Sequence, residues 1–166
     1  MGIFSVRRRM EKQYKDMIYT RRLYAFEGEF FRQAKYNAIS KQRTINTLKT
    51  LGQKIWDIEA KHSGKPIPVI RFGKGVYNTQ ARLQNAYYSW CDGVTIELAP
   101  TQRDIVTLIH ELVHGLGYQY HDSRFVGKYI KLLVKYAKLN KQDIIQVWSS
   151  VFERILQSGI IFCNIG

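Results

Sequence analysis

Cysteine is scarce in this chain of 166 residues, which contains only Cys91 and Cys163. Two cysteines cannot form the framework of several disulfides that small secreted domains use, so we expect an intracellular, cytoplasmic protein with reduced thiols. Long apolar runs are also lacking. No stretch approaches the roughly 18 apolar residues of a membrane-spanning helix, and no apolar signal segment follows the basic start of the chain. We therefore expect neither a membrane span nor secretion.

Acidic residues are few as well. The chain has 13 Asp and Glu against 26 Lys and Arg, which gives a net charge of +13 at pH 7. Such an excess favours a polyanionic partner, and nucleic acid is the partner that we expect. A hydrophobic content of 45%, with 13% aromatic residues, argues against a disordered chain. The length fits a single core of ordinary size.

The strongest chemical signal is the segment from residue 105 to residue 125, IVTLIHELVHGLGYQYHDSRF. Within it, His110, Glu111 and His114 form the pattern H-E-x-x-H. Two imidazoles four residues apart on a helix lie on the same face, so both can bind one Zn²⁺ ion. The glutamate beside the first imidazole is then within reach of a metal-bound water and can act as the general base.

A third ligand has to come from beyond this helix. Gly115 and Gly117 allow the chain to leave the helix through a positive φ, and His121 follows seven residues after His114. Three histidines leave one coordination position for water, which is typical of a catalytic zinc site. The alternative interpretation is a pair of helix histidines that only pack or face solvent.

The sequence HELVHGLGYQYHDSRF resembles the metal-binding segment of the SprT-like and WLM-type zinc metallopeptidases, which are small zincins. That segment has H-E-x-x-H, a further histidine and often a phenylalanine four residues later, a spacing that His121 and Phe125 keep. The resemblance implies that His110, His114 and His121 bind Zn²⁺ and that Glu111 is the general base. It also implies an association with DNA, cleavage of proteins attached to DNA, and binding of an extended peptide along a sheet edge.

Three other families fit the segment less well. Metzincins need a histidine where this chain has Tyr120 and a methionine further on, whereas the methionines here are at positions 1, 10 and 17. Thermolysin-like enzymes take a glutamate ligand from the next helix, and only Glu153 follows Glu111. The YbeY-like endoribonucleases carry H-x-x-x-H-x-x-G-Y-x-H, which is one residue shorter than the pattern here. A metal-dependent endoribonuclease of that kind remains an alternative.

Basic residues also dominate the start of the chain, where Arg7, Arg8 and Arg9 belong to a helix predicted over residues 3–24. This helix would contact nucleic-acid phosphates, dock on an assembly partner, or lie on the surface with one buried stripe. We expect residues 1–39 to form a basic helical arm and residues 40–166 to form the metallopeptidase domain.

The remaining patterns predict an α+β protein with the minimal zincin fold. A second helix is expected over residues 40–61, followed by the strand IPVIRF and a hairpin that turns at Asp92-Gly93. Thr101 is the expected N-cap of the H-E-x-x-H helix, and a last helix is expected from residue 141 to about 157. The fold would thus combine N-terminal helices, a small and mostly antiparallel sheet, the active-site helix and C-terminal helices.

Polar residues after the motif add candidate contacts. Tyr118, Tyr120 and Arg124 follow it closely and would bind substrate or stabilise an oxyanion, although core or rim packing is the alternative role for the tyrosines. Lysines at helical spacing come next and would form one basic stripe, which either holds a nucleic-acid backbone or is the solvated face of a helix. The stripe begins at Arg124 and continues through Lys128, Lys131, Lys135 and Lys138.

Together these features predict a zinc-dependent metallopeptidase that hydrolyses peptide bonds of a protein or peptide substrate on or near nucleic acid. The basic start and the small size of the chain would also suit a protein packaged in a virion. The second alternative is therefore a catalytically silent zincin that serves as a nucleic-acid-associated or virion structural protein. The intact Glu111 argues against that alternative, because a silent scaffold does not need this carboxylate.

Overall fold

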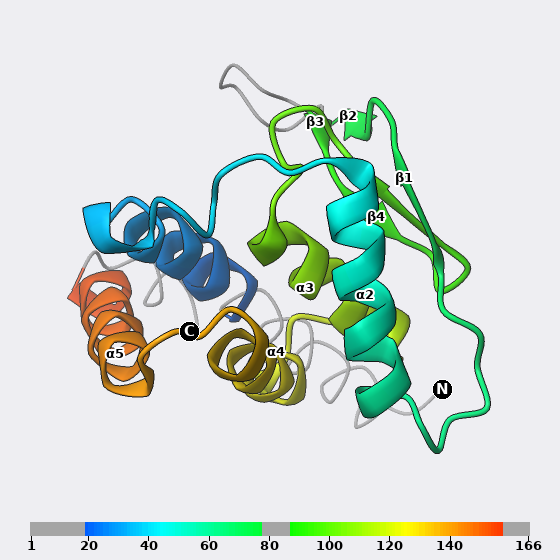
Figure 1. Cartoon of the computed structure of the whole chain (residues 1–166). Coiled ribbons are helices and arrows are strands. Elements are labelled where there is room, and N and C mark those ends of the chain that lie inside the picture. The colour runs from blue at the N-terminus through cyan, green and yellow to red at the C-terminus, as the bar shows by residue number, and fades with distance from the viewer. Residues whose placement is uncertain (1–18, 78–86, 158–166) are drawn as a thin grey trace.

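The computed structural model describes residues 19–77 and 87–157 of the chain (Figure 1). Arg7, Arg8 and Arg9 therefore lie outside the described residues. The description begins in a helix that runs to residue 30, and this helix continues past residue 24, where we expected it to end. The other helices are η1 (Ala34–Tyr36), α2 (Ile45–Glu59), α3 (Ile105–Gly115), α4 (Ser123–Tyr136) and α5 (Lys141–Gln157). The strands are β1 (Val69–Phe72), β2 (Val76–Tyr77), β3 (Tyr87–Tyr88), β4 (Trp90–Cys91) and β5 (Thr95–Leu98).

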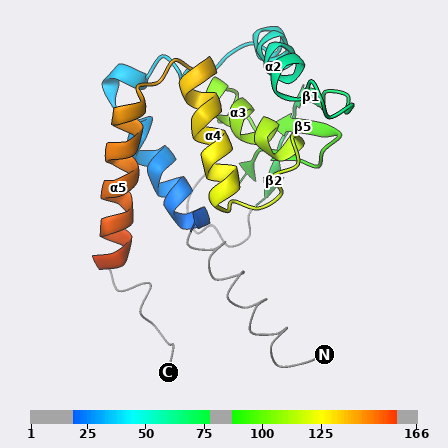
Figure 2. The same ribbon diagram turned by 90° about the horizontal axis from the view of Figure 1, so that it is seen from below.

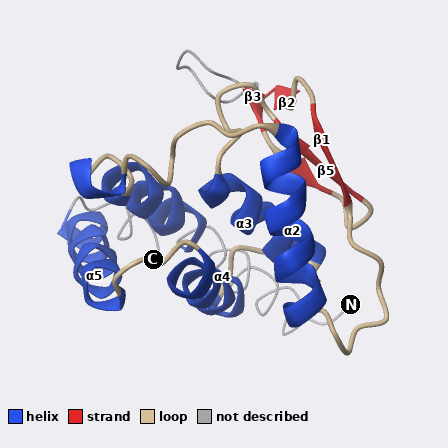
Figure 3. Cartoon of the chain, viewed as in Figure 1, coloured by secondary structure: helices blue, strands red, loops and turns tan. Residues whose placement is uncertain are grey.

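These elements form an α+β structure in which the strands gather at one side of the molecule (Figure 3). The main sheet has the order β1-β5-β4, and β2 pairs with β3 in a separate ribbon. We expected a mostly antiparallel sheet, and this was wrong for its longest pairing, because β1 and β5 run parallel. The chain between them crosses back through β2, β3 and β4, as a parallel pair requires a long connection.

The predicted hairpin is confirmed, since β4 and β5 pair antiparallel around Asp92-Gly93. The Asp92 carboxylate accepts hydrogen bonds from the N–H groups of Val94 and Thr95, at 2.9 and 2.7 Å. Gly93 has φ +90°, a conformation that a residue without a Cβ adopts at little cost. The turn therefore comes from local chemistry, which is why the sequence predicts it.

Helix α2 is shorter than the helix expected over residues 40–61. It begins after Thr44, whose hydroxyl accepts a hydrogen bond from the N–H of Thr47. The N–H of Arg43 donates to the carbonyl of Arg103, which ties the preceding segment to the loop before α3 and removes it from the helix. Gly52 lets α2 lie close to β1, because a Cβ there would meet the Ile70 side chain at 2.5 Å.

Helix α3 occupies the centre of the molecule, with α2, α4 and the main sheet around it (Figures 1 and 2). Its N-cap is Asp104 and not Thr101, because the Asp104 carboxylate accepts from the N–H of Thr107 at 2.8 Å while Thr101 lies in the preceding turn. Burial raises the pKa of Asp104 to about 6 against the opposing effect of the Thr107 hydrogen bonds. Apolar residues of α3 itself are buried on most sides of the helix, namely Val106, Leu108, Ile109, Leu112 and Val113.

The helix that ends at residue 30 packs into the same core and lies beside α5 (Figures 1 and 2). Leu23, Phe26 and Phe30 are fully buried, and the Phe26 ring meets the Trp148 ring of α5 at 5.6 Å between centroids. The buried cluster thus contains residues from both sides of residue 39, where we placed a domain boundary. Among the described residues, no helix has the length and apolar character that crossing a membrane demands.

Candidate metal centre

His110 and His114 lie one turn apart on α3, as the motif predicts, with their ring centroids 5.1 Å apart. The chain leaves α3 through Gly117, whose φ of +105° confirms the expected glycine turn. His121 then returns to the helix immediately before Asp122, the N-cap of α4. The carboxylate of Asp122 accepts from the N–H groups of Arg124 and Phe125, so the third histidine is held at the start of a helix.

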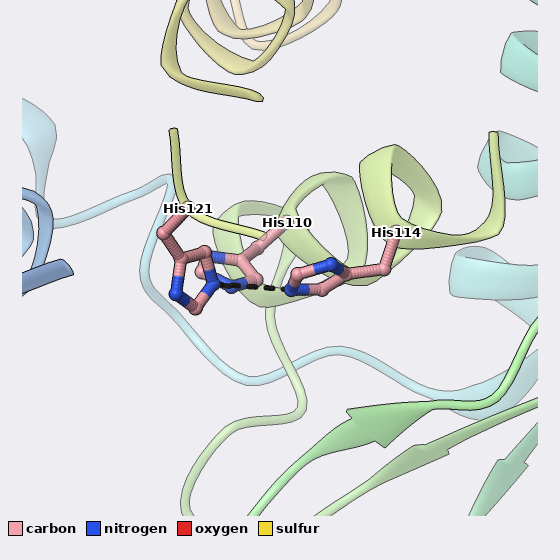
Figure 4. A group of neighbouring side chains, drawn as sticks. All are labelled: His110, His114 and His121. Carbon is pink, nitrogen blue, oxygen red and sulfur yellow. Dashed lines mark hydrogen bonds between the residues drawn. The ribbon is translucent and has the colours of Figure 1, made fainter. Parts of the chain in front are cut away.

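The three imidazoles point toward one another (Figure 4). The Nε2 atom of His121 lies 2.9 Å from Nε2 of His110 and 3.1 Å from Nε2 of His114. Tetrahedral zinc with Zn–N bonds of roughly 2.0–2.1 Å places its nitrogen ligands about 3.3 Å apart. The spacing of the nitrogens is therefore close to that of a three-histidine zinc site.

The Nδ1 atoms of His110 and His114, which lie on the side of each ring away from the cluster centre, each face a hydrogen-bond acceptor. His110 Nδ1 lies 3.1 Å from a carboxylate oxygen of Glu27, and His114 Nδ1 lies 2.7 Å from the backbone carbonyl of Tyr118. Since a carbonyl or an ionised carboxylate only accepts, Nδ1 of each ring carries a proton, and the Nε2 lone pair of each ring points inward whenever the ring is neutral. Lone pairs that converge in this way repel each other unless a cation lies between them, and neutral imidazole is a ligand for zinc, copper, iron and nickel.

The protonation states of His114 and His121 suit metal binding. Burial lowers the pKa of His114 to about 4 and that of His121 to about 3, and the charge of His110 contributes in the same direction. Both rings are therefore neutral at pH 7, which is the form that binds a metal. Burial also acts to lower the pKa of His110, but the charge and hydrogen bond of Glu27 outweigh it and raise this pKa.

Phe125 forms an apolar wall behind all three imidazoles. Its fully buried ring lies 5.0 Å from that of His110, 4.6 Å from His114 and 4.7 Å from His121, measured between centroids. The four-residue spacing between His121 and Phe125 thus brings one ring of α4 against the whole cluster. Such a wall excludes water from one side of the site and restricts the rotation of the rings.

Glu111 is also held inside the structure, with only 5% of its surface exposed. It lines a cavity of about 350 Å³ together with His110, Glu27, Tyr24 and other residues. Burial, which the charge of His110 opposes and the charge of Glu27 assists, raises the pKa of Glu111 to about 7. A carboxylate with such a pKa can take up and release a proton near neutral pH.

The other predicted contacts lie away from this cavity. Tyr118 supplies its backbone carbonyl to His114, Tyr120 is exposed, and the exposed Arg124 bonds with its guanidinium to Asp122. These three residues line a separate hollow on the segment between α3 and α4. In the described part of the chain, none of the three is among the residues that line the Glu111 cavity.

Two site residues that we did not predict come from the helix that ends at residue 30. Glu27 contacts His110, and the Tyr24 ring stacks on His110 at 6.3 Å and meets His121 edge-on at 5.5 Å. Loss of solvent around the hydroxyl, followed by the charges of Glu27 and Glu111, raises the pKa of Tyr24 to about 12, although 53% of the residue's surface is exposed. The only signal in the sequence is their three-residue spacing, which puts both on one helix face.

The lysines of the predicted basic stripe differ in their contacts. Lys128 and Lys135 both bind the carboxylate of Glu59 on α2, with N···O distances of 2.6 and 2.7 Å. Lys138 lies beyond the end of α4 with φ +58°, and Lys131 is exposed on the helix. Two of the four lysines therefore join α4 to α2, while Lys131, Lys135 and Lys138 are exposed.

Comparison with known proteins adds no relative. A scan against protein-family models found no match, and neither did searches of curated proteins and of solved structures. The function of this chain has to be inferred from the geometry and chemistry of its own residues.

Proposed function

We propose that this protein is a zinc-dependent metallopeptidase of the minimal zincin type, in which His110, His114 and His121 bind the metal and Glu111 is the general base. The convergence of three Nε2 atoms, two of them on rings whose Nδ1 atoms face an acceptor, carries this proposal. A zinc ion bound there would polarise a substrate carbonyl and lower the pKa of a bound water to about 7.

Glu111 supplies the proton transfer in this proposal. Its carboxylate lies in the cavity beside His110, where in its ionised form it can accept a proton from the attacking water. It then passes that proton to the amine that leaves when the peptide bond breaks. A buried carboxylate without a catalytic task costs free energy. This cost favours the enzyme over the silent zincin.

Tyr24 is the proposed stabiliser of the oxyanion, in place of Tyr118, Tyr120 and Arg124. Its ring lines the Glu111 cavity and contacts His110 and His121. Because its pKa is about 12, the hydroxyl is a hydrogen-bond donor at neutral pH. A donor aimed at the charge that develops on the substrate carbonyl stabilises the transition state.

The main sheet has two edge strands, β1 and β4, and we propose that an extended substrate binds at β4. Of the two hairpin strands, β5 is central and β4 lies at the edge. Both strands contact α3, the helix of the metal ligands. A peptide that adds to a strand edge binds mainly through its backbone, so the proposed enzyme would accept unfolded substrates with little regard to sequence.

The proposed setting is on or near nucleic acid, and the support for it is the net charge of +13. The DNA-associated SprT-like and WLM-type proteases remain the group to which we propose that this chain is related. The YbeY-like endoribonuclease is the alternative enzyme. The carboxylate of Glu111 favours peptide hydrolysis over that alternative.

Parallel assays of the purified protein test this proposal. We expect the wild type to contain about one zinc per chain by elemental analysis and to cleave an unfolded protein but not labelled RNA. Glu111→Gln should keep its zinc and lose cleavage by at least about 100-fold, because general acid–base catalysis contributes about 10²–10⁴ in rate. The proposal would be overturned if the wild type cleaved RNA but not protein, or if Glu111→Gln cleaved the unfolded protein as fast as the wild type.

A further inference from the structure

We infer that Glu27 is a positioning residue of the metal centre, and that the pair of Glu27 and Tyr129 fixes His110 for metal binding. The inference rests on the proposed metal site. It assigns a role to the helix that ends at residue 30, which the H-E-x-x-H motif does not include. In this role Glu27 touches neither substrate nor metal and acts through the imidazole of His110.

The geometry joins three helices at one oxygen atom. The Oε1 atom of Glu27 lies 3.1 Å from Nδ1 of His110 on α3 and accepts a hydrogen bond of 2.7 Å from the hydroxyl of Tyr129 on α4. Tyr129 is fully buried, and its ring lies 5.5 Å from that of His110. The side chain of Glu27 is 20% exposed and that of His110 is 9% exposed. The contact is therefore shielded from water and held from both sides.

The charge of Glu27 has a specific consequence for the ligand. A carboxylate that accepts the Nδ1 proton fixes the ring as the tautomer whose Nε2 lone pair is available, and it makes that nitrogen more basic. Among the described residues, Glu27 forms an ion pair with no lysine or arginine, and its partner is His110. A dication bound to His110 would therefore also balance a partly buried negative charge.

The same face of the helix reaches the third ligand. Thr20, Tyr24 and Glu27 are spaced four and three residues apart, which aligns them on one side of a helix. The Thr20 hydroxyl lies 3.5 Å from Nδ1 of His121, and the Tyr24 ring lies against both His110 and His121. One helix face thus contacts two of the three proposed ligands, which identifies this helix as a support of the site.

Zinc affinity of full-length variants tests the inference without any assay of catalysis. Glu27→Gln keeps the shape of the side chain but removes its charge, and its amide can donate to Nδ1 and favour the tautomer with a proton on Nε2. We expect this variant to bind zinc about 10–100-fold more weakly in competition with a chromogenic chelator. Bound Co²⁺ should show a shifted visible absorption spectrum. Tyr129→Phe should weaken zinc binding in the same direction by a smaller factor.

Glu29→Gln is the matched control, because Glu29 lies on the same helix and pairs with Arg154 instead of the site. We expect its zinc affinity and Co²⁺ spectrum to equal those of the wild type. If Glu27 had only a structural role, the isosteric glutamine would preserve zinc affinity. A Glu27→Gln variant that loses zinc affinity while its metal-free form keeps the wild-type melting temperature therefore supports the positioning role.

Two outcomes separate this inference from the proposed function. If the wild type binds no zinc, the proposed metal site itself is wrong. If the wild type binds zinc, His121→Ala does not, and Glu27→Gln binds within about twofold of the wild type, only the role of Glu27 is overturned. Should Glu27→Gln fail to fold, Tyr129→Phe decides, and an unchanged affinity of that variant overturns the inference.

Discussion

His121 approaches His110 to 2.9 Å between their Nε2 atoms, although eleven residues and the end of a helix separate them. The approach depends on the turn at Gly117 and on the Asp122 cap that starts α4 directly after His121. Two histidines on one helix turn occur in many structural contexts. The third nitrogen is what makes this group suitable for a metal ion.

Removal of the third imidazole is expected to abolish tight metal binding. His121→Ala should lower zinc affinity by more than about 100-fold, because two of three protein ligands remain. Elemental analysis after dialysis against a weak chelator measures the loss. His62→Ala is the control, since His62 is exposed and lies outside the site, and it should retain as much zinc as the wild type. Zinc retained by His121→Ala would contradict the ligand set.

The aromatic wall behind the ligands gives a prediction for stability. Phe125 is fully buried against all three imidazole rings, and truncation of such a ring leaves a cavity. Phe125→Ala should lower the free energy of unfolding of the metal-free protein by about 3–5 kcal/mol, measured by urea denaturation. Ile58→Ala, at an exposed position of α2, should change it by less than about 0.5 kcal/mol. Equal effects of the two changes would contradict the packing.

The oxyanion proposal separates two tyrosines. Tyr24 lines the Glu111 cavity, whereas Tyr120 lies in the hollow between α3 and α4. Tyr24→Phe removes one hydrogen-bond donor and should lower kcat for peptide hydrolysis by about 100-fold at unchanged zinc content. Tyr120→Phe is the control and should leave kcat within about twofold of the wild type. The opposite result would restore the assignment that the sequence suggested.

Glu59 makes stability depend on pH. Burial acts to raise the pKa of this carboxyl group, which is 8% exposed, but hydrogen bonds from Lys128, Lys135 and Tyr136 outweigh it and lower the pKa to about 2. A folded-state pKa below the unfolded value of about 4.3 stabilises the fold above that value. The stabilisation that ionised Glu59 gives to the fold is then lost as the pH falls from about 5 to about 2.

Substitution of this glutamate tests the pH dependence. Glu59→Gln should lower the free energy of unfolding by about 1–3 kcal/mol at neutral pH, and by about half as much near pH 3. Urea denaturation at both pH values measures the difference. Glu153→Gln, on the exposed side of α5, is the control with little effect at either pH. A difference between wild type and Glu59→Gln that does not shrink at low pH would contradict the lowered pKa.

Two lysines of the predicted stripe should behave differently toward DNA. Lys131 is exposed, whereas the Lys128 side chain is 17% exposed and bound to Glu59. If DNA contacts this face, Lys131→Ala should reduce the slope of log K against log salt by about 1, because one phosphate contact is lost. Lys128→Ala should leave that slope unchanged and lower thermal stability instead. Equal slopes for Lys131→Ala and the wild type would exclude Lys131 from the contact.

Local sequence patterns predicted the elements whose formation depends on residues close together in the chain. The H-E-x-x-H helix, the Asp92-Gly93 hairpin and α5 follow from periodicity and turn chemistry within a few residues, and the structure confirms them. The cap of α3 was missed by three residues, because Thr101 and Asp104 can both accept a hydrogen bond and only the backbone path favours Asp104.

Contacts between distant segments were beyond the reach of these patterns. Glu27 meets His110 across 83 residues, and Lys128 meets Glu59 across 69 residues. Neither pairing leaves a local signature, because each depends on how two helices that are distant in sequence pack against each other. The parallel pairing of β1 with β5 was missed for the same reason, since hydrophobic alternation does not encode strand direction.

The position of His121 next to the N-cap of α4 links the ion that we propose for this site to the dynamics of a helix. Asp122 accepts hydrogen bonds from the amides of Arg124 and Phe125, at 3.0 Å each, and is the residue next to His121. A movement of the His121 ring would act directly on the first turn of α4. Extraction of the ion should therefore accelerate amide hydrogen exchange at these two positions before it affects α5, so that the start of α4 reports whether the site is filled.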